Sequence, residues 1–160
     1  MPEINFFKED IEIDLRMLKG FRNWITNTAA HHNESIETIN YIFCSDKLLH
    51  TMNVDYLNHD TYTDIITFDL REENQQTPIE ADIFISIERV KENSKQLSTS
   101  FKQELARVMI HGLLHLIGFK DKTMQEKERM REMESEALEF LPGATVPRGT
   151  VQKSSAFGKV

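Results

Sequence analysis

HGLLHLIGFKD, residues 111–121, carries the sharpest signal in the chain. His111 and His115 stand four residues apart, so on a helix both imidazoles leave the same face, one turn apart. Gly118 then ends the helix, and the turn that it allows lets the carboxylate of Asp121 fold back toward the two histidines. These residues predict a metal centre at the end of a histidine helix, with a ligand spacing like that of the metzincin peptidases.

The ligand set predicts the kind of metal chemistry. Three protein ligands leave a fourth position open, which is typical of a catalytic zinc site, so we expect one Zn²⁺ ion held by His111, His115 and Asp121. Two histidines and a carboxylate also suit ferrous iron. A metzincin peptidase carries its general-base glutamate directly after the first histidine, and that position is Gly112 here. The spacing therefore indicates a metal-dependent hydrolase and keeps a metallopeptidase only as an alternative.

Two helices frame this segment. Ser100 and Gln103 have the spacing of a capping box, and a stripe of apolar residues follows, so a helix should begin after Ser100 and end at Gly118. A last helix is expected over 123–141, because apolar residues recur there at helical spacing.

The rest of the chain predicts a mixed α+β domain, with a small mixed sheet packed on helices. Further helices are expected over 9–30, 46–58 and 88–97, and strands over 39–45, 64–70 and 81–87. A length of 160 residues suits one such domain, which we place at 1–141. Residues 142–160 contain two prolines and few apolar residues, so we expect a flexible C-terminal tail.

Charge and cysteine content limit the partners and the compartment. The net charge is −7, from 19 Lys plus Arg against 26 Asp plus Glu, which argues against broad nucleic-acid binding. An RNA enzyme with this balance needs a local basic patch. Cys44 is the single cysteine, the N-terminus is acidic and no apolar run could span a bilayer, so we expect a cytoplasmic protein with no membrane partner.

HGLLHLIGF, with TDIITF upstream and ADIFIS between, resembles the YbeY family of endoribonucleases, from about residue 36 to 141. The resemblance implies a zinc-dependent, single-strand-specific endoribonuclease that acts in maturation of the 3′ end of 16S rRNA and in ribosome quality control. It also implies RNA partners, namely single-stranded RNA, ribosomal RNA or the small ribosomal subunit, and no DNA. His111 and His115 match the first two family ligands, and Asp64 matches a family aspartate before a strand.

The chain departs from the family pattern at two places. The usual third ligand is a histidine preceded by aspartate, and these positions read Asp121 and Lys120 here. A family arginine thought to help at the phosphate is replaced by Leu57. If a cation must hold the scissile phosphate, Arg107 is the first candidate, followed by Lys120 and Lys122. The alternative for Arg107 is an ion pair on the helix, with Glu104 as a partner.

Two questions stay open at this point. A noncatalytic ribosome-assembly factor with a structural zinc would carry the same ligands, and the nucleophile could be water or the 2′-hydroxyl of the RNA. Among the other histidines, His31 and His32 are expected to cap a helix end, and His59 is expected on a loop surface.

Overall fold

The computed structural model describes residues 1–57, 63–72 and 77–143 and confirms the α+β fold. Within these ranges, four strands form one mixed sheet in the order β1-β2-β4-β3. The strands β1, β2 and β4 are parallel, and β3 runs antiparallel to β4. Their bounds are Glu3–Lys8 for β1, Ile36–Cys44 for β2, Ile65–Asp69 for β3 and Ile79–Ser86 for β4.

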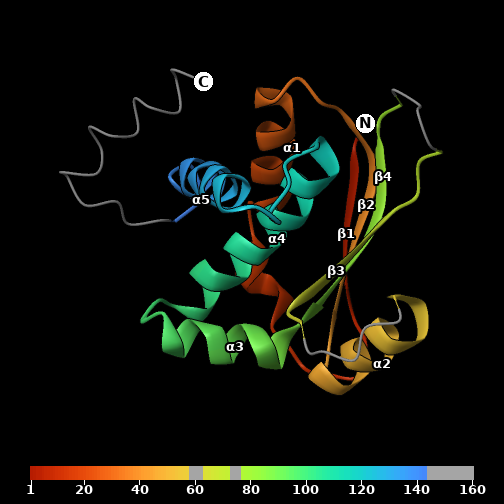
Figure 1. The fold of residues 1–160 in the computed structure, drawn as a ribbon, viewed down its shortest axis with the longest axis vertical. Coiled ribbons are helices and arrows are strands. Elements are labelled where there is room, and N and C mark those ends of the chain that lie inside the picture. Colours follow the sequence, from red (N-terminus) through yellow and green to blue (C-terminus); the bar gives the residue numbers. More distant parts are fainter. Residues whose placement is uncertain (58–62, 73–76, 144–160) are drawn as a thin grey trace.

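Helices cover one face of the sheet and one end of it (Figure 1). Figure 1 shows α1, α4 and α5 on the same side of the sheet, with α3 below them and α2 at the lower end. The helices are α1 (Phe21–His31), α2 (Asp46–Leu57), α3 (Ile87–Gln96), α4 (Phe101–Ile117) and α5 (Met124–Leu138), with a short 3₁₀ turn, η1, at Leu15–Leu18.

The main core lies between the sheet and α4. Alternate residues of a strand face the same side, and those of β2 and β4 that face the helices, such as Tyr41 and Ile83, are fully buried. They meet the apolar side of α4, including Leu105, Met109 and Leu113. Across the sheet, Cys44 packs with Leu49 of α2 as the small buried hydrophobe that its sequence neighbours indicate.

The N-terminal region differs from the prediction. A single helix was expected over 9–30, but the structure has the strand β1, the turn η1 and a helix that begins only at Phe21. Asp14 caps the start of η1 and Lys19 ends it, and Gly20, with a left-handed φ of 86°, is the N-cap residue of α1. The strand forms because Glu3–Lys8 pairs residue for residue with β2, a partner some 35 residues away that helical periodicity does not reveal.

Other boundaries moved by a few residues. The last helix ends at Leu138 rather than 141, and Leu141 follows it as a buried core residue. Most of the expected tail, 144–160, lies outside the described residues, as does His59. No described helix combines the length and the apolar character that crossing a bilayer would require.

Candidate metal centre

The helix α4 carries both histidines and ends where the sequence predicted. Ser100 caps its start, with the Ser100 hydroxyl accepting a hydrogen bond from the backbone N–H of Gln103 at 3.1 Å. Gly118 ends it with a φ of 123°, and its N–H donates to the carbonyls of Leu114 and His115. The left-handed conformation at Gly118 turns the chain back over the helix, as the predicted site requires.

A second cap closes the turn from the other side. The Thr123 hydroxyl accepts from the N–H of Glu126, and the Glu126 carboxylate accepts from the N–H of Thr123, which completes a capping box at the start of α5. Asp121 therefore sits on a five-residue turn, 119–123, held at one end by Gly118 and at the other by the cap of α5.

The structure brings the three predicted ligands together. Nε2 of His111 lies 3.4 Å from one carboxylate oxygen of Asp121, and Nε2 of His115 lies 3.3 Å from the other. One ligand atom from each residue falls within 4.8 Å of the others. Two atoms bonded at about 2.0–2.2 Å to a tetrahedral zinc ion lie about 3.3–3.5 Å apart, so the donor set and the spacing fit such an ion.

Glu134 is a site residue that the sequence analysis missed. Its carboxylate lies 2.6 Å from Nδ1 of His111, on the opposite side of the ring from Asp121, and its side chain is only 6% exposed. Burial lowers the pKa of His111, but the hydrogen bond and the negative charge of Glu134, together with Asp121 and Asp64, raise that pKa overall. The sequence offered one signal that could have identified Glu134, namely its place at helical spacing among the apolar residues of α5. The structure shows it buried beside Met130 and Ala137.

Arg107 forms the ion pair with Glu104 that the sequence offered as an alternative. Its Nε donates to Glu104 at 2.9 Å, its Nη2 donates to the second oxygen of Glu104, and its Nη1 donates to Glu134 at 3.1 Å. The hydrogen bond to Glu104 raises the pKa of Arg107 against the effect of burial. The guanidinium therefore lies one side chain, that of Glu134, away from His111, and its contact with a phosphate stays a prediction.

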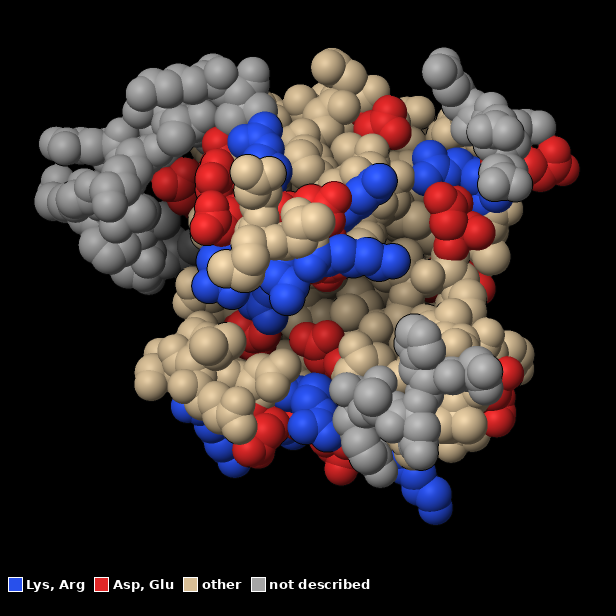
Figure 2. Space-filling model, viewed as in Figure 1, with Lys and Arg blue, Asp and Glu red and all other residues tan. Residues whose placement is uncertain are grey.

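Lys120 and Lys122 are exposed on the turn that carries Asp121. Figure 2 shows Lys and Arg side chains gathered in a band across the middle of one face, above a hollow. In the same view, Figure 1 places α4 and the turn before α5 in this part of the molecule. Lys120 and Lys122 therefore place two exposed positive charges directly beside Asp121, despite the net charge of −7.

Asp64 lies close to the same helix, just before β3. Its carboxylate accepts a hydrogen bond from Asn93 of α3 at 3.4 Å. Burial raises the pKa of Asp64, and the positive charges of Arg107 and His111 oppose that rise.

Leu57, which stands where the sequence comparison expected an arginine, ends α2 and is 42% exposed. His32 is the C-cap residue of α1, as expected.

Gly112 explains why this helix has no glutamate next to the first histidine. A Cβ at position 112 would lie 3.0 Å from the Cδ1 of Ile65, 3.1 Å from that of Ile83 and 3.3 Å from the hydroxyl of Thr67. The backbone of α4 thus packs directly on β3 and β4, and no carboxylate at this position could reach the metal side of the helix.

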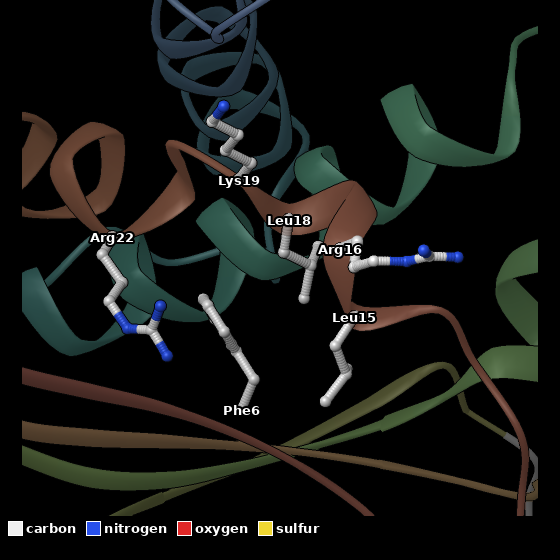
Figure 3. A pocket seen from close by; sticks show the side chains of 6 residues that line it. All are labelled: Phe6, Leu15, Arg16, Leu18, Lys19 and Arg22. Atoms are coloured by element: carbon white, nitrogen blue, oxygen red, sulfur yellow. The ribbon is translucent and has the colours of Figure 1, made fainter.

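A hollow of about 400 Å³ lies at the other edge of the sheet, beside β1 and η1 (Figure 3). Phe6, Leu15 and Leu18 form its apolar part, whereas Figure 3 shows Arg16 and Lys19 pointing away from it in different directions. The guanidinium of Arg22 stacks on Phe6, and its Nε donates to the carbonyl of Ile4. Without converging polar groups, this hollow has no feature of a reaction centre.

A family model and curated relatives point to one family, and a solved structure shares the fold. A family model described as Endoribonuclease YbeY matches residues 3–142. Curated relatives named Endoribonuclease YbeY are 53% identical in Cytophaga hutchinsonii and 48% identical in Christiangramia forsetii. These alignments cover 84% and 85% of this chain, and 93% and 92% of the relatives. A solution structure from Thermotoga maritima is 22% identical, with a TM-score of 0.63 over 97% of this chain and 95% of that one, which shows the shared fold.

Proposed function

This chain belongs to the YbeY endoribonuclease family, and on that premise we propose that it is a zinc-dependent, single-strand-specific endoribonuclease. We propose further that it acts in the cytoplasm on ribosomal RNA, in maturation of the 16S rRNA 3′ end and in ribosome quality control. The observation that supports the metal dependence is that ligand atoms of His111, His115 and Asp121 lie within 4.8 Å of one another.

The protein side of the mechanism follows from the placement of these groups. His111 and His115 would hold the ion through Nε2, the nitrogen that faces Asp121 in each ring, and Asp121 would hold it through its carboxylate. A divalent ion bound there supplies Lewis acidity toward a phosphate oxygen or a water molecule. We propose that the exposed Lys120 and Lys122 attract the RNA backbone to the turn, while the acidic remainder of the surface disfavours binding elsewhere.

Single-stranded RNA suits this arrangement better than a duplex. His115 at the end of α4 and Asp121 on the turn after it are both partly exposed, and a flexible strand can bend to bring one phosphate to an ion held there. A peptide substrate is disfavoured because Gly112 leaves no room for the general base that a metzincin peptidase uses.

The test is cleavage of a single-stranded RNA by zinc-loaded protein, compared with chelated protein and with His115→Ala. His50→Ala on α2 serves as the matched control, because it removes an imidazole from a helix that packs at the lower end of the sheet. We expect cleavage by the zinc form and by the control only, with a matched duplex left intact.

The other outcomes separate the alternatives. No cleavage by protein with zinc bound, together with binding to ribosomal particles, would favour a noncatalytic assembly factor. Hydrolysis of casein that a chelator abolishes would favour a peptidase. Equal RNA cleavage by every form would mean a contaminating nuclease. Replacing Lys120 and Lys122 by glutamine should weaken cleavage without changing zinc affinity.

A further inference from the structure

We propose that Glu134, anchored by Arg107, is a positioning residue that fixes the imidazole of His111 with Nε2 turned toward the metal. The inference deepens the proposed function and rests on one part of it, namely that a metal ion binds His111, His115 and Asp121. It gives Arg107 a role within the protein, through Glu134 and His111, in place of direct contact with the substrate.

The geometry around His111 separates its two nitrogens. Nδ1 lies 2.6 Å from a carboxylate oxygen of Glu134, and Nε2 lies 3.4 Å from Asp121. A carboxylate accepts a hydrogen bond from Nδ1–H, which leaves the lone pair of a neutral imidazole on Nε2. Glu134 therefore selects the tautomer that a metal needs and fixes the plane of the ring.

The two histidines differ in this respect. Among the described residues, the structure gives His115 a carboxylate neighbour only in Asp121, whereas His111 has Asp121 on one side and Glu134 on the other. The side chain of His111 is 18% exposed and that of His115 is 39% exposed. His111 is thus the more buried of the two histidines and the one with a second carboxylate partner, and His115 and Asp121 form the more accessible part of the site.

Glu134 is itself held in place. The second oxygen of Glu134 accepts a hydrogen bond from Nη1 of Arg107. Arg107 in turn donates to both oxygens of Glu104, whose side chain is 2% exposed. Residues 104, 107 and 111 lie on one face of α4 at helical spacing, so a line of charged groups runs along the helix to the metal ligand. Bidentate pairing of this kind fixes an arginine more firmly than a single contact does.

Zinc affinity, measured by competition with a chromogenic chelator, tests the proposal without any RNA. We expect Glu134→Gln to weaken zinc binding by about 10–100-fold, because an amide cannot accept from both His111 and Arg107. Glu128→Gln is the matched control, since it makes the same change at an exposed position of the same helix, and its affinity should equal that of the unmodified protein.

Two further measurements distinguish positioning from simple packing. Nitrogen NMR of the neutral histidines should show His111 as a single tautomer with a proton on Nδ1, and as a mixture in Glu134→Gln. Arg107→Gln leaves Glu134 in the chain but removes its anchor, so it should also weaken zinc binding, by about tenfold. If Glu134→Gln does not fold, Arg107→Gln decides the question.

The results separate this inference from the proposed function. Unchanged zinc affinity and an unchanged tautomer in both variants would overturn the positioning role while leaving the metal site intact. Failure of the unmodified protein to bind zinc would overturn the metal site itself. Arg107→Gln with unchanged zinc affinity but weaker RNA binding would return Arg107 to the role of phosphate contact.

Discussion

At position 112, where a metzincin peptidase would place its general base, α4 rests on the sheet through a glycine. We expect Gly112→Glu to lower the free energy of unfolding by more than about 3 kcal/mol, because it forces an unpaired charge against Ile65 and Ile83. Urea unfolding measures this loss. Gly112→Ala should change stability little, since a gain of about 1 kcal/mol in helix propensity offsets the tight contacts.

Gly118→Ala provides a contrast at the same scale. A Cβ at position 118 meets open space, but the φ of 123° is one that L-residues rarely adopt. Backbone strain rather than crowding should therefore lower the stability of Gly118→Ala, by about 1–3 kcal/mol.

If Gly112→Glu proved as stable as the unmodified protein, the close packing of α4 on the sheet would be wrong.

Asp64 gives a prediction about pH. Burial raises its pKa above the usual 3.8, so the folded state holds a proton on Asp64 more tightly than the unfolded state does. The contribution of this group to stability is thus fullest at low pH and is lost as pH rises from about 4 through the raised pKa. Metal-free Asp64→Asn should be more stable than the unmodified protein at neutral pH, and the gap should close toward pH 4. Thermal melts across pH test it, and a constant gap would contradict it.

At the scale of elements, the turn between α4 and α5 depends on the cap at Thr123. Thr123→Ala should lower the free energy of unfolding by about 0.5–2 kcal/mol, because it removes the acceptor for the N–H of Glu126. It should also weaken zinc binding, since Asp121 lies two residues before the cap. Thr51→Ala, in the exposed middle of α2, is the matched control and should cost nothing. Equal losses in both variants would show that the cap has no special role.

The histidine helix could be predicted well because its signals are local. Ser100, the apolar stripe, the two histidines and Gly118 all lie within one segment, and the structure confirms a helix from Phe101 to Ile117. The sequence also predicted the convergence of His111, His115 and Asp121, because a glycine turn allows few other placements for the carboxylate.

What the sequence could not provide were contacts between distant elements. The strand β1 needs β2 beside it, and six residues alone gave no stronger signal than the helical periodicity that followed them. Glu134 was one acid among many in an acidic helix, and only the packing of α5 on α4 shows that this one is buried against His111. Charged residues at helical spacing are usually solvent-exposed, so sequence reasoning had no reason to single it out.

For the whole molecule, we propose that 1–141 folds as one domain that does not need the residues after it. Leu141 is a buried member of the main core. Deleting 144–160 should therefore leave the melting temperature unchanged within about 2 °C. Deleting from 139 onward removes Leu141 and should lower it by about 4–20 °C, from a loss of about 2–5 kcal/mol. An equal effect of both deletions would show that the domain extends past residue 143.

Zinc should stabilise the whole fold, since it binds the native arrangement of three residues that the unfolded chain does not hold together. At a free concentration 100 times the dissociation constant, the gain is about 2.7 kcal/mol, which raises the melting temperature by about 5–11 °C. Differential scanning calorimetry with and without a chelator measures the shift. His115→Ala should show almost none, and a full shift in that variant would place the ion elsewhere.

The order of the elements along the chain has a consequence for the newly made protein. Every strand of the described sheet is complete by Ser86. The helix α4, which packs on the sheet, and Glu134, which contacts His111, come later in the chain. At a synthesis rate of about 5–20 residues per second, the stretch from Ser86 to Glu134 takes roughly 2–10 seconds to make, and the part of the sheet that α4 covers is exposed during much of that time. A nascent chain therefore exposes apolar surface before its three predicted metal ligands have been made, and we expect it to bind a chaperone in that interval.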